Sequence, residues 1–256
     1  MITLEEVFGV SKSPIRSYVE HPEVDGAFER ALRTDRHIVV YGASKQGKTS
    51  LVSKYLSYDD NIVVHCGAKS SVVEINKRIL KELGAEIVEE RQDTHRRGTK
   101  INAFAKIKAK IPALVSGEMG AGIAKDESAE HQVKYKEMDV DLEQAQNIYD
   151  FYKESKSNKF IIMENFHYLS EDAQRQLAID LRTYQDLGMR YIILGIWKEK
   201  NKLNVFNGDL TSRVDEISVE PWDEVEFVNI IKNGSRDLNI EFSDEITKRL
   251  IKRSKW

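Results

Sequence analysis

The chain has 256 residues and a formal net charge of −3, and charged residues make up 32% of it. This length is sufficient for one large α/β domain with an extension and a sizeable core. The balanced charge excludes a protein that is basic throughout, although a local basic patch is still compatible with it. The single cysteine, Cys66, excludes an internal disulfide framework and is typical of a reducing compartment.

No apolar run approaches the ~18 residues of a membrane-spanning helix. Residues 1–10 also lack the basic and apolar regions of a signal peptide. We therefore expect a cytoplasmic protein with no membrane partner.

Short apolar runs rich in β-branched residues predict the strands of this chain. In chain order they are Arg36–Tyr41, Asn61–Gly67, Lys159–Asn165, Met189–Trp197 and Val214–Val219. Such runs are typical of strands buried on both faces of a parallel sheet. Helical patterns separate several of them, and one of these helices is bounded by Ser170 as N-cap and Gly188 as stop. This alternation predicts an α/β fold with a doubly wound, mostly parallel sheet and helices on both faces.

The connection between the second and third predicted strands is unusually long and predicts an insertion at about residues 68–158. It begins with an amphipathic helix that ends at Gly84 and closes with another that carries Leu142 and Ile148 on one face. Between them, residues 115–131 are small, polar and glycine-rich, which predicts a mobile loop or a poorly ordered hairpin.

A basic stretch runs from Arg91 to Lys110 within this insertion. Its cationic residues are Arg91, Arg96, Arg97, Lys100, Lys106, Lys108 and Lys110. They would suit DNA phosphates or an acidic partner. A charge run of this kind is more often a solvated helix face, which we favour, and nucleic-acid binding is kept as the alternative.

The strongest motif follows the first predicted strand and opens a helix. It reads Gly42, Ala43, Ser44, Lys45, Gln46, Gly47, Lys48, Thr49 and Ser50, and its first eight residues match the phosphate-binding loop (P-loop) pattern G-x-x-x-x-G-K-[ST]. The glycines let the backbone wrap a phosphate, and the N–H groups at the helix start supply partial positive charge. We predict that Lys48 reaches the β- and γ-phosphates and that Thr49 offers its hydroxyl to Mg²⁺.

Two polar residues end the third predicted strand, at the edge where open α/β sheets bind ligands. We predict that Glu164 holds Mg²⁺ directly or through water, with a solvent-facing strand end as the alternative. Asn165 stands where a hydrolytic ATPase normally has a carboxylate, and an amide can position water but cannot accept its proton. Slow hydrolysis is expected. His167 and Glu171 are further candidates, each with a structural alternative.

Arg213 directly precedes the fifth predicted strand, and we expect it near the nucleotide end of the sheet. It is predicted to stabilise the transferring phosphoryl group, in its own chain or a neighbour's, with ion pairing as an equal alternative. Asn201–Asn204 reads NKLN and lacks the terminal carboxylate of a guanine-reading motif. ATP is therefore favoured over GTP.

Together the P-loop, FIIMENFHYL, YIILGIW and GDLTSRVDEISVEPW segments resemble the ATPase module of bacterial STAND-type and related AAA+ proteins, from about Ser11 to Lys232. The resemblance implies a five-stranded sheet with the P-loop strand central, and adenine held around Ser17, Tyr18 and Val19. It also implies an ATPase core over residues 1–220 and the start of an incomplete helical lid over residues 221–256. ATP and Mg²⁺ are the implied cofactors.

Three functions stay open at this point. The favoured one is an ATP-controlled switch or slow ATPase that assembles with itself or with an effector protein, and several bacterial members of the resembled family act in defence against phage. The second is an ATPase directed at nucleic acid, as in transposition or replication. The third is a non-hydrolysing interaction module in which the nucleotide is structural.

Overall fold

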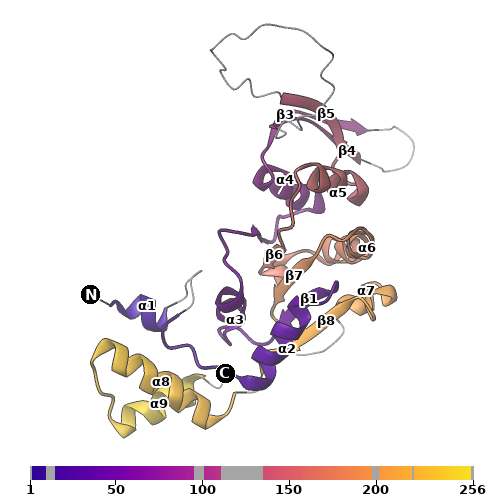
Figure 1. Cartoon of the computed structure of the whole chain (residues 1–256). Coiled ribbons are helices and arrows are strands. Elements are labelled where there is room, and N and C mark those ends of the chain that lie inside the picture. The colour runs from indigo at the N-terminus through magenta and orange to yellow at the C-terminus, as the bar shows by residue number, and fades with distance from the viewer. Residues whose placement is uncertain are drawn as a thin grey trace, which may run out of the picture. The chain divides into compact units, whose positions relative to one another are not determined.

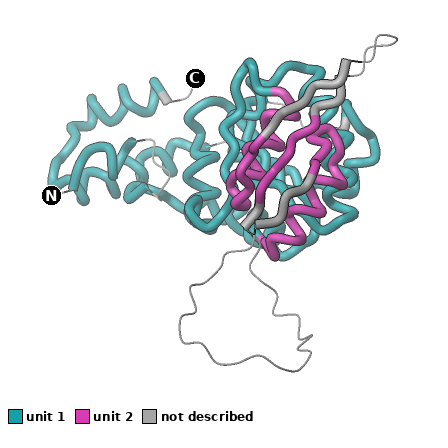
Figure 2. The backbone as a smooth tube through the Cα atoms, turned by 90° about the horizontal axis from the view of Figure 1, so that it is seen from above, with its two compact units in different colours: residues 1–70, 159–256 teal, residues 71–158 magenta. Residues whose placement is uncertain are grey.

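The computed structural model of the chain describes residues 2–9, 15–94, 101–110, 135–197, 202–220 and 222–254. The chain forms two compact units, one from Met1–Ser70 with Lys159–Trp256 and the other from Ser71–Asn158 (Figure 2). The second unit lies in the connection between strands β2 (Ile62–His65) and β6 (Ile161–Glu164). The long insertion is therefore present.

A five-stranded parallel sheet forms the centre of the first unit. Its order is β2-β6-β7-β1-β8, with β1 at His37–Tyr41, β7 at Tyr191–Gly195 and β8 at Val214–Ser218. The P-loop strand β1 is internal and pairs in parallel with β7 on one side and β8 on the other. Because all strands run the same way, their carboxyl ends meet at one edge, where such sheets bind ligands. The predicted α/β fold is confirmed.

Helices cover both faces of this sheet (Figure 1). On one face, α2 (Pro22–Leu32) and α3 (Lys48–Tyr55) bury Phe28 and Leu51 in a core shared with Ile38 of β1 and Leu194 of β7. On the other face lies α6 (Glu171–Leu187), whose Tyr184 ring is 5.1 Å from the ring of Tyr191 in β7. Short helices α7 (Lys202–Phe206), η1 (Phe166–Tyr168) and η2 (Gly208–Leu210) complete the connections. Within the described ranges, no helix is both long and apolar enough to cross a bilayer.

Helix α6 begins and ends where its sequence signals predict. The hydroxyl of Ser170 accepts the backbone N–H of Ala173 at 3.3 Å, which caps the helix start. At the other end, Gly188 has a φ of 89°, the left-handed conformation that glycine adopts without a steric penalty.

His37 joins the sheet to α6. Its Nδ1 accepts the backbone N–H of Tyr191 at 3.0 Å, so Nε2 carries the proton and donates to the carbonyl of Leu181 at 2.7 Å. The side chain is fully buried, and burial is the main cause that lowers its pKa to about 4. The ring is therefore neutral in the folded protein at neutral pH.

This neutral histidine predicts acid sensitivity. An unfolded histidine titrates near pH 6.5, so below that pH the unfolded chain binds a proton that the folded chain refuses until about pH 4. The contribution of the neutral His37 to stability is fully present above pH 6.5, and it is lost as the pH falls from 6.5 towards 4. We expect His37 to lower the free energy of unfolding by about 2 kcal/mol between pH 7.5 and pH 5. Because Asp180, whose pKa burial raises to about 7, acts in the opposite direction, the contribution is measured by urea unfolding as the difference between the wild type and His37→Gln. The same drop in His37→Gln would contradict the assignment.

The C-terminal part of the first unit consists of two helices, α8 (Glu224–Leu238) and α9 (Asp244–Ser254), in the region that the sequence resemblance predicts to be a lid. The N-terminal helix α1 (Leu4–Phe8) packs closely on α8, because a Cβ added at Gly234 would lie only 2.1 Å from the ring of Phe8. An ion pair of 2.9 Å between Arg16 and Asp237 adds to this contact. The N-terminal helix is therefore packed against a helix from the C-terminal part of the sequence.

The second unit combines two helices with an antiparallel sheet. Helices α4 (Val72–Glu82) and α5 (Ala145–Glu154) are the two amphipathic helices predicted at the ends of the insertion. The sheet has the order β3-β4-β5, with β3 at Ala85–Thr94, β4 at Ile101–Lys110 and β5 at Tyr135–Asp141.

The prediction of a solvated helix face for the Arg91–Lys110 stretch is wrong, because its described residues lie in β3 and β4. In β4 the buried residues Ala105 and Ile107 alternate with Lys106 and Lys108, as expected for a strand with one covered face. Acidic residues lie opposite both lysines on the neighbouring strands: Glu89 and Asp139 for Lys106, and Glu86 and Glu137 for Lys108. Acidic positions therefore flank these two lysines on the neighbouring strands. Arg96, Arg97, Lys100 and the predicted loop at residues 115–131 lie outside the described residues.

Candidate nucleotide-binding site

The P-loop connects the end of β1 to the start of α3, and its two glycines are required by the backbone. Gly42 has a φ of 149°, and a Cβ there would lie 2.7 Å from the side chain of Val219. Gly47 has a φ of 83° and forms the N-cap of α3. With no side chain at either position, the loop can turn sharply and point its N–H groups at a bound phosphate.

Lys48 lies in the first turn of α3, with its ammonium folded back onto the loop. Its Nζ donates to the carbonyl oxygens of Gly42 at 3.0 Å and Ala43 at 2.6 Å. Burial lowers the pKa of Lys48, while the nearby carboxylates of Glu220 and Glu164 act in the opposite direction. The Lys48 ammonium therefore lies next to the P-loop, where it would form a charge-assisted hydrogen bond with a bound phosphate.

Glu220 is a P-loop neighbour that sequence reasoning missed. It follows β8, and its carboxylate accepts the backbone N–H of Ala43. This hydrogen bond connects the segment between β8 and α8 to the start of the P-loop. No local pattern in the sequence points to it, because the two residues are far apart along the chain.

The side chains of Thr49 and Glu164 come together across the sheet edge, although β7 lies between the strands that lead to them. The Thr49 hydroxyl donates to the two carboxylate oxygens of Glu164 at 3.2 and 3.4 Å. Tyr58 donates a further hydrogen bond to Glu164, and burial followed by this carboxylate raises the pKa of Tyr58. Burial, with Glu164 as a second cause, raises the pKa of Cys66 to about 12. Glu164 is itself only 7% exposed, so it faces inward.

Asn165 has an uncommon backbone conformation at the end of β6. Its φ of 60° and ψ of 34° are left-handed, which asparagine tolerates better than most residues. The side chain is exposed, and the backbone carbonyl accepts the N–H of Tyr168 at 3.0 Å. Among the other candidates, His167 has its ring 4.2 Å from that of Tyr168, and Glu171 forms an exposed ion pair with Arg175 at 3.1 Å.

The expected position of Arg213 at the nucleotide end of its own sheet is wrong. β8 runs parallel to β1, and Val214 pairs with His37 at the start of β1, whereas the P-loop follows Tyr41 at its end. Arg213 therefore lies about 16 Å away, at the opposite edge of the sheet. There its guanidinium pairs with Asp186 and donates to Gln185. A role in a neighbouring chain's site stays a prediction.

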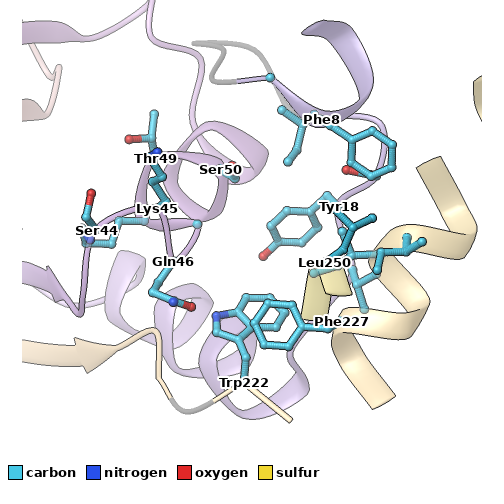
Figure 3. Close-up of a pocket in the computed structure, with 18 of the residues that line it drawn as sticks. Phe8, Tyr18, Ser44, Lys45, Gln46, Thr49, Ser50, Trp222, Phe227 and Leu250 are labelled. Atoms are coloured by element: carbon cyan, nitrogen blue, oxygen red, sulfur yellow. The ribbon is translucent and has the colours of Figure 1, made fainter. Parts of the chain in front are cut away.

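One cavity of about 770 Å³ opens beside the P-loop (Figure 3). Ser44–Ser50, Glu164, Asn165 and His167 line its polar end. The other end is apolar and is built by α1, the segment before α2, and the lid helices. Its lining residues include Phe8, Tyr18, Val19, Trp222, Phe227, Ile231, Phe242 and Leu250. A volume of this size is ordinary for a cofactor-sized ligand.

Two of these aromatic residues bring the apolar end close to the P-loop. A Cβ at Gly47 would lie 3.8 Å from the ring of Trp222, and Trp222 meets Phe227 at a ring distance of 6.2 Å. Tyr18 and Ser17 both line the cavity from the segment before α2. The Ser17 side chain is buried, and its hydroxyl donates to the carbonyl of Val7. The cavity therefore combines a phosphate-binding end with an aromatic end.

Comparisons with known proteins agree with this geometry. No protein-family model matches the sequence, and no curated protein matches it significantly. Among solved structures, a Walker-type ATPase of Pyrococcus abyssi is similar with a TM-score of 0.56 at 14% identity, over 96% of this chain and 66% of that one. Cdc6p from Pyrobaculum aerophilum is similar with a TM-score of 0.50 at 15% identity, over 92% of this chain and 54% of that one. The chain thus spans 66% or less of these two proteins and has the fold of P-loop ATPases.

Proposed function

We propose that this chain binds ATP with Mg²⁺ and works as a nucleotide-controlled switch with slow hydrolysis. The observation that carries the proposal is the cavity beside the P-loop, in which the P-loop, the Thr49–Glu164 pair and an aromatic compartment converge. A nucleoside triphosphate has the three matching parts, namely a polyphosphate, a metal-binding oxygen set and a planar base.

The polar end suits a magnesium triphosphate. Lys48 and the backbone N–H groups at the start of α3 would hold the phosphates, as the loop geometry allows. Thr49 and Glu164 supply oxygen ligands, which Mg²⁺ prefers, and Mg²⁺ commonly takes only one or two from the protein. The described residues hold no group of three or more histidines, cysteines and acids that would form a metal site independent of phosphate. When bound, the metal neutralises charge on the phosphates.

The apolar end suits adenine. Tyr18, Trp222 and Phe227 offer aromatic rings to a planar base. The indole nitrogen of Trp222 is buried and has no hydrogen-bond acceptor within the described residues, so it can donate to a ligand once the site is filled. Preference for ATP over GTP rests on the sequence of Asn201–Asn204, which lacks a guanine-reading carboxylate.

We infer the switch from the elements that contribute residues to the cavity lining. The P-loop belongs to the sheet core, whereas Phe227 and Leu250 belong to α8 and α9 of the lid. A ligand that contacts both favours the arrangement in which they are closed around it. Assembly with itself or with an effector protein is part of the proposal, and a role in defence against phage stays a prediction of the sequence resemblance.

The test is a binding titration of the chain with ATP and GTP, with and without Mg²⁺, followed by native mass measurement. We expect ATP to bind about tenfold more tightly than GTP and the assembled mass to rise with ATP. Absence of ATP binding would overturn the proposal, and binding without any change in mass would remove the switch. Stimulation of hydrolysis by DNA would instead favour the nucleic-acid alternative, which the acidic positions opposite Lys106 and Lys108 do not support.

Asn165→Asp should speed hydrolysis by about tenfold, because a carboxylate can accept the proton that the amide cannot. Aspartate also tolerates the left-handed backbone of this position. Phosphate release at saturating Mg-ATP measures the effect. Asn165→Gly is the matched control, since it keeps the backbone conformation without a carboxylate and should give no gain. An unchanged rate in Asn165→Asp would place the catalytic base elsewhere.

A further inference from the structure

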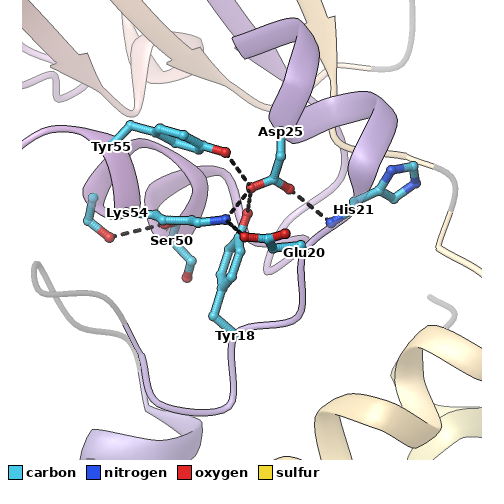
Figure 4. Close-up of polar contacts among 8 residues, drawn as sticks. Tyr18, Glu20, His21, Asp25, Ser50, Lys54 and Tyr55 are labelled. Carbon is cyan, nitrogen blue, oxygen red and sulfur yellow. Dashed lines mark hydrogen bonds and ion pairs between the residues drawn. The ribbon is translucent and has the colours of Figure 1, made fainter. Parts of the chain in front are cut away.

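A polar network centred on a buried carboxylate joins the segment before α2 to the helix that carries the P-loop (Figure 4). Asp25 of α2 is only 4% exposed. Its Oδ1 accepts hydrogen bonds from Lys54 at 2.9 Å, the Tyr18 hydroxyl at 2.8 Å and the Tyr55 hydroxyl at 3.0 Å. Its Oδ2 accepts the backbone N–H of His21 at 2.8 Å. Both carboxylate oxygens are therefore engaged.

Lys54 is the second centre of the network. Its ammonium lies 4.9 Å from the ring centroid of Tyr18 and 5.0 Å from that of Tyr55, which are cation–π distances. It also pairs with Glu20 at 2.6 Å. Tyr18 is consequently fixed by two interactions: its hydroxyl donates to Asp25, and its ring face lies against the ammonium of Lys54.

The charge states of the network favour this arrangement. Burial acts to raise the pKa of Asp25, but the hydrogen bond from Lys54 and those from its other donors lower it overall. Burial acts to lower the pKa of Lys54, and its hydrogen bonds to Glu20 and Asp25 raise it overall. Burial and then Asp25 raise the pKa of Tyr18. At neutral pH the carboxylate and ammonium are charged and the phenol keeps its proton.

The network also lies at a fixed distance from the P-loop, because helix α3 connects the two. Lys54 lies in the last turn of α3, and Lys48 lies in its first turn at the P-loop. At 1.5 Å per helical residue the two positions are about 9 Å apart along the helix axis. Tyr18 lines the same cavity as the P-loop residues. A rigid helix thus connects the aromatic wall of the cavity to its phosphate-binding end.

We propose that Asp25 is a positioning residue for nucleotide recognition. Together with Lys54 it holds the ring of Tyr18 as one wall of the base compartment, at a fixed separation from the P-loop. Asp25 acts through Tyr18 and does not touch the nucleotide. The inference rests on the proposed ATP binding and deepens it, because it explains how the site would prefer a whole nucleotide to a bare polyphosphate.

The test compares ATP with inorganic tripolyphosphate, which has the phosphates but no base. Asp25→Asn keeps the size of the side chain and removes its charge. We expect it to weaken ATP binding by about tenfold and to leave tripolyphosphate binding within about twofold of the wild type, since only the base compartment loses its fixed wall. Tyr18→Phe keeps the ring, loses the hydroxyl, and should weaken ATP binding alone by about threefold.

The chain offers a matched control in Asp180 of α6. It is a second buried carboxylate, 5% exposed, and is not among the residues that line the cavity. Burial raises its pKa to about 7, so Asp180→Asn removes about half a negative charge at neutral pH, at a site away from the cavity. This variant should keep the wild-type ratio of ATP to tripolyphosphate affinity.

Each outcome decides the inference. Equal weakening of both ligands in Asp25→Asn, or no weakening of ATP binding, would overturn it, and so would a wild-type protein that binds both ligands equally well. Urea unfolding identifies a misfolded variant, in which case the Tyr18→Phe result decides. The proposed function itself fails if the wild type binds no ATP, or if the Lys48→Ala variant binds ATP as tightly as the wild type does.

Discussion

Lys48→Ala is expected to weaken ATP binding by about 100-fold, equivalent to about 2.7 kcal/mol. The ammonium already lies at the P-loop, where it donates to the carbonyls of Gly42 and Ala43. In this partly buried position a charge-assisted bond to a phosphate is stronger than an exposed one, and alanine removes it completely. Titration calorimetry with ATP and Mg²⁺ measures the loss.

Lys153→Ala is the control for this prediction. Lys153 is exposed on α5 in the second unit, and the substitution removes the same charge from the chain. Its ATP affinity should match the wild type. Near-equal affinities of Lys48→Ala and Lys153→Ala would mean that the P-loop is not the phosphate site.

Glu164→Gln is expected to lower ATP turnover by about 100-fold while it weakens ATP binding much less. The amide oxygen can still accept from Thr49 and Tyr58, so the local packing is kept. The lost negative charge removes the ligand that Mg²⁺ prefers, and the Mg²⁺ concentration needed for half-maximal rate should rise.

Two measurements keep this prediction testable even if the wild-type rate is low. Phosphate release gives the turnover, and the difference between ATP affinity with and without Mg²⁺ gives the metal contribution. Tyr58→Phe removes only a hydroxyl that donates to Glu164, so its metal dependence should stay close to that of the wild type. A Glu164→Gln protein with unchanged turnover and unchanged metal dependence would exclude Glu164 as a metal ligand.

Local sequence patterns predicted the sheet core because its strands are short apolar runs and its helices have clear boundary residues. Ser170 and Gly188 are examples, since each forms the cap that its residue type favours. The P-loop was equally predictable, because its glycines are required by backbone geometry within eight consecutive residues.

The missed features have physical causes. In β4 the alternation of Ala105 and Ile107 with lysines was a strand signal, but the charge run was interpreted as a helix face. Arg213 was predicted at the wrong edge of the sheet. It directly precedes β8, and residues that precede a parallel strand lie at the edge opposite to the carboxyl ends of the strands. Glu220 and Tyr58 contact residues far along the chain, and no local periodicity encodes such contacts.

The close approach of Phe8 to Gly234 has a practical consequence for experiments on this chain. Because α1 is packed against α8, a fluorescent label on the first helix would report on movement of the lid, although it is attached at the other end of the sequence. By the same contact, an affinity tag that disturbs α1 would disturb the packing of α8. Kinetic work is therefore best done with the N-terminal residues in their natural form.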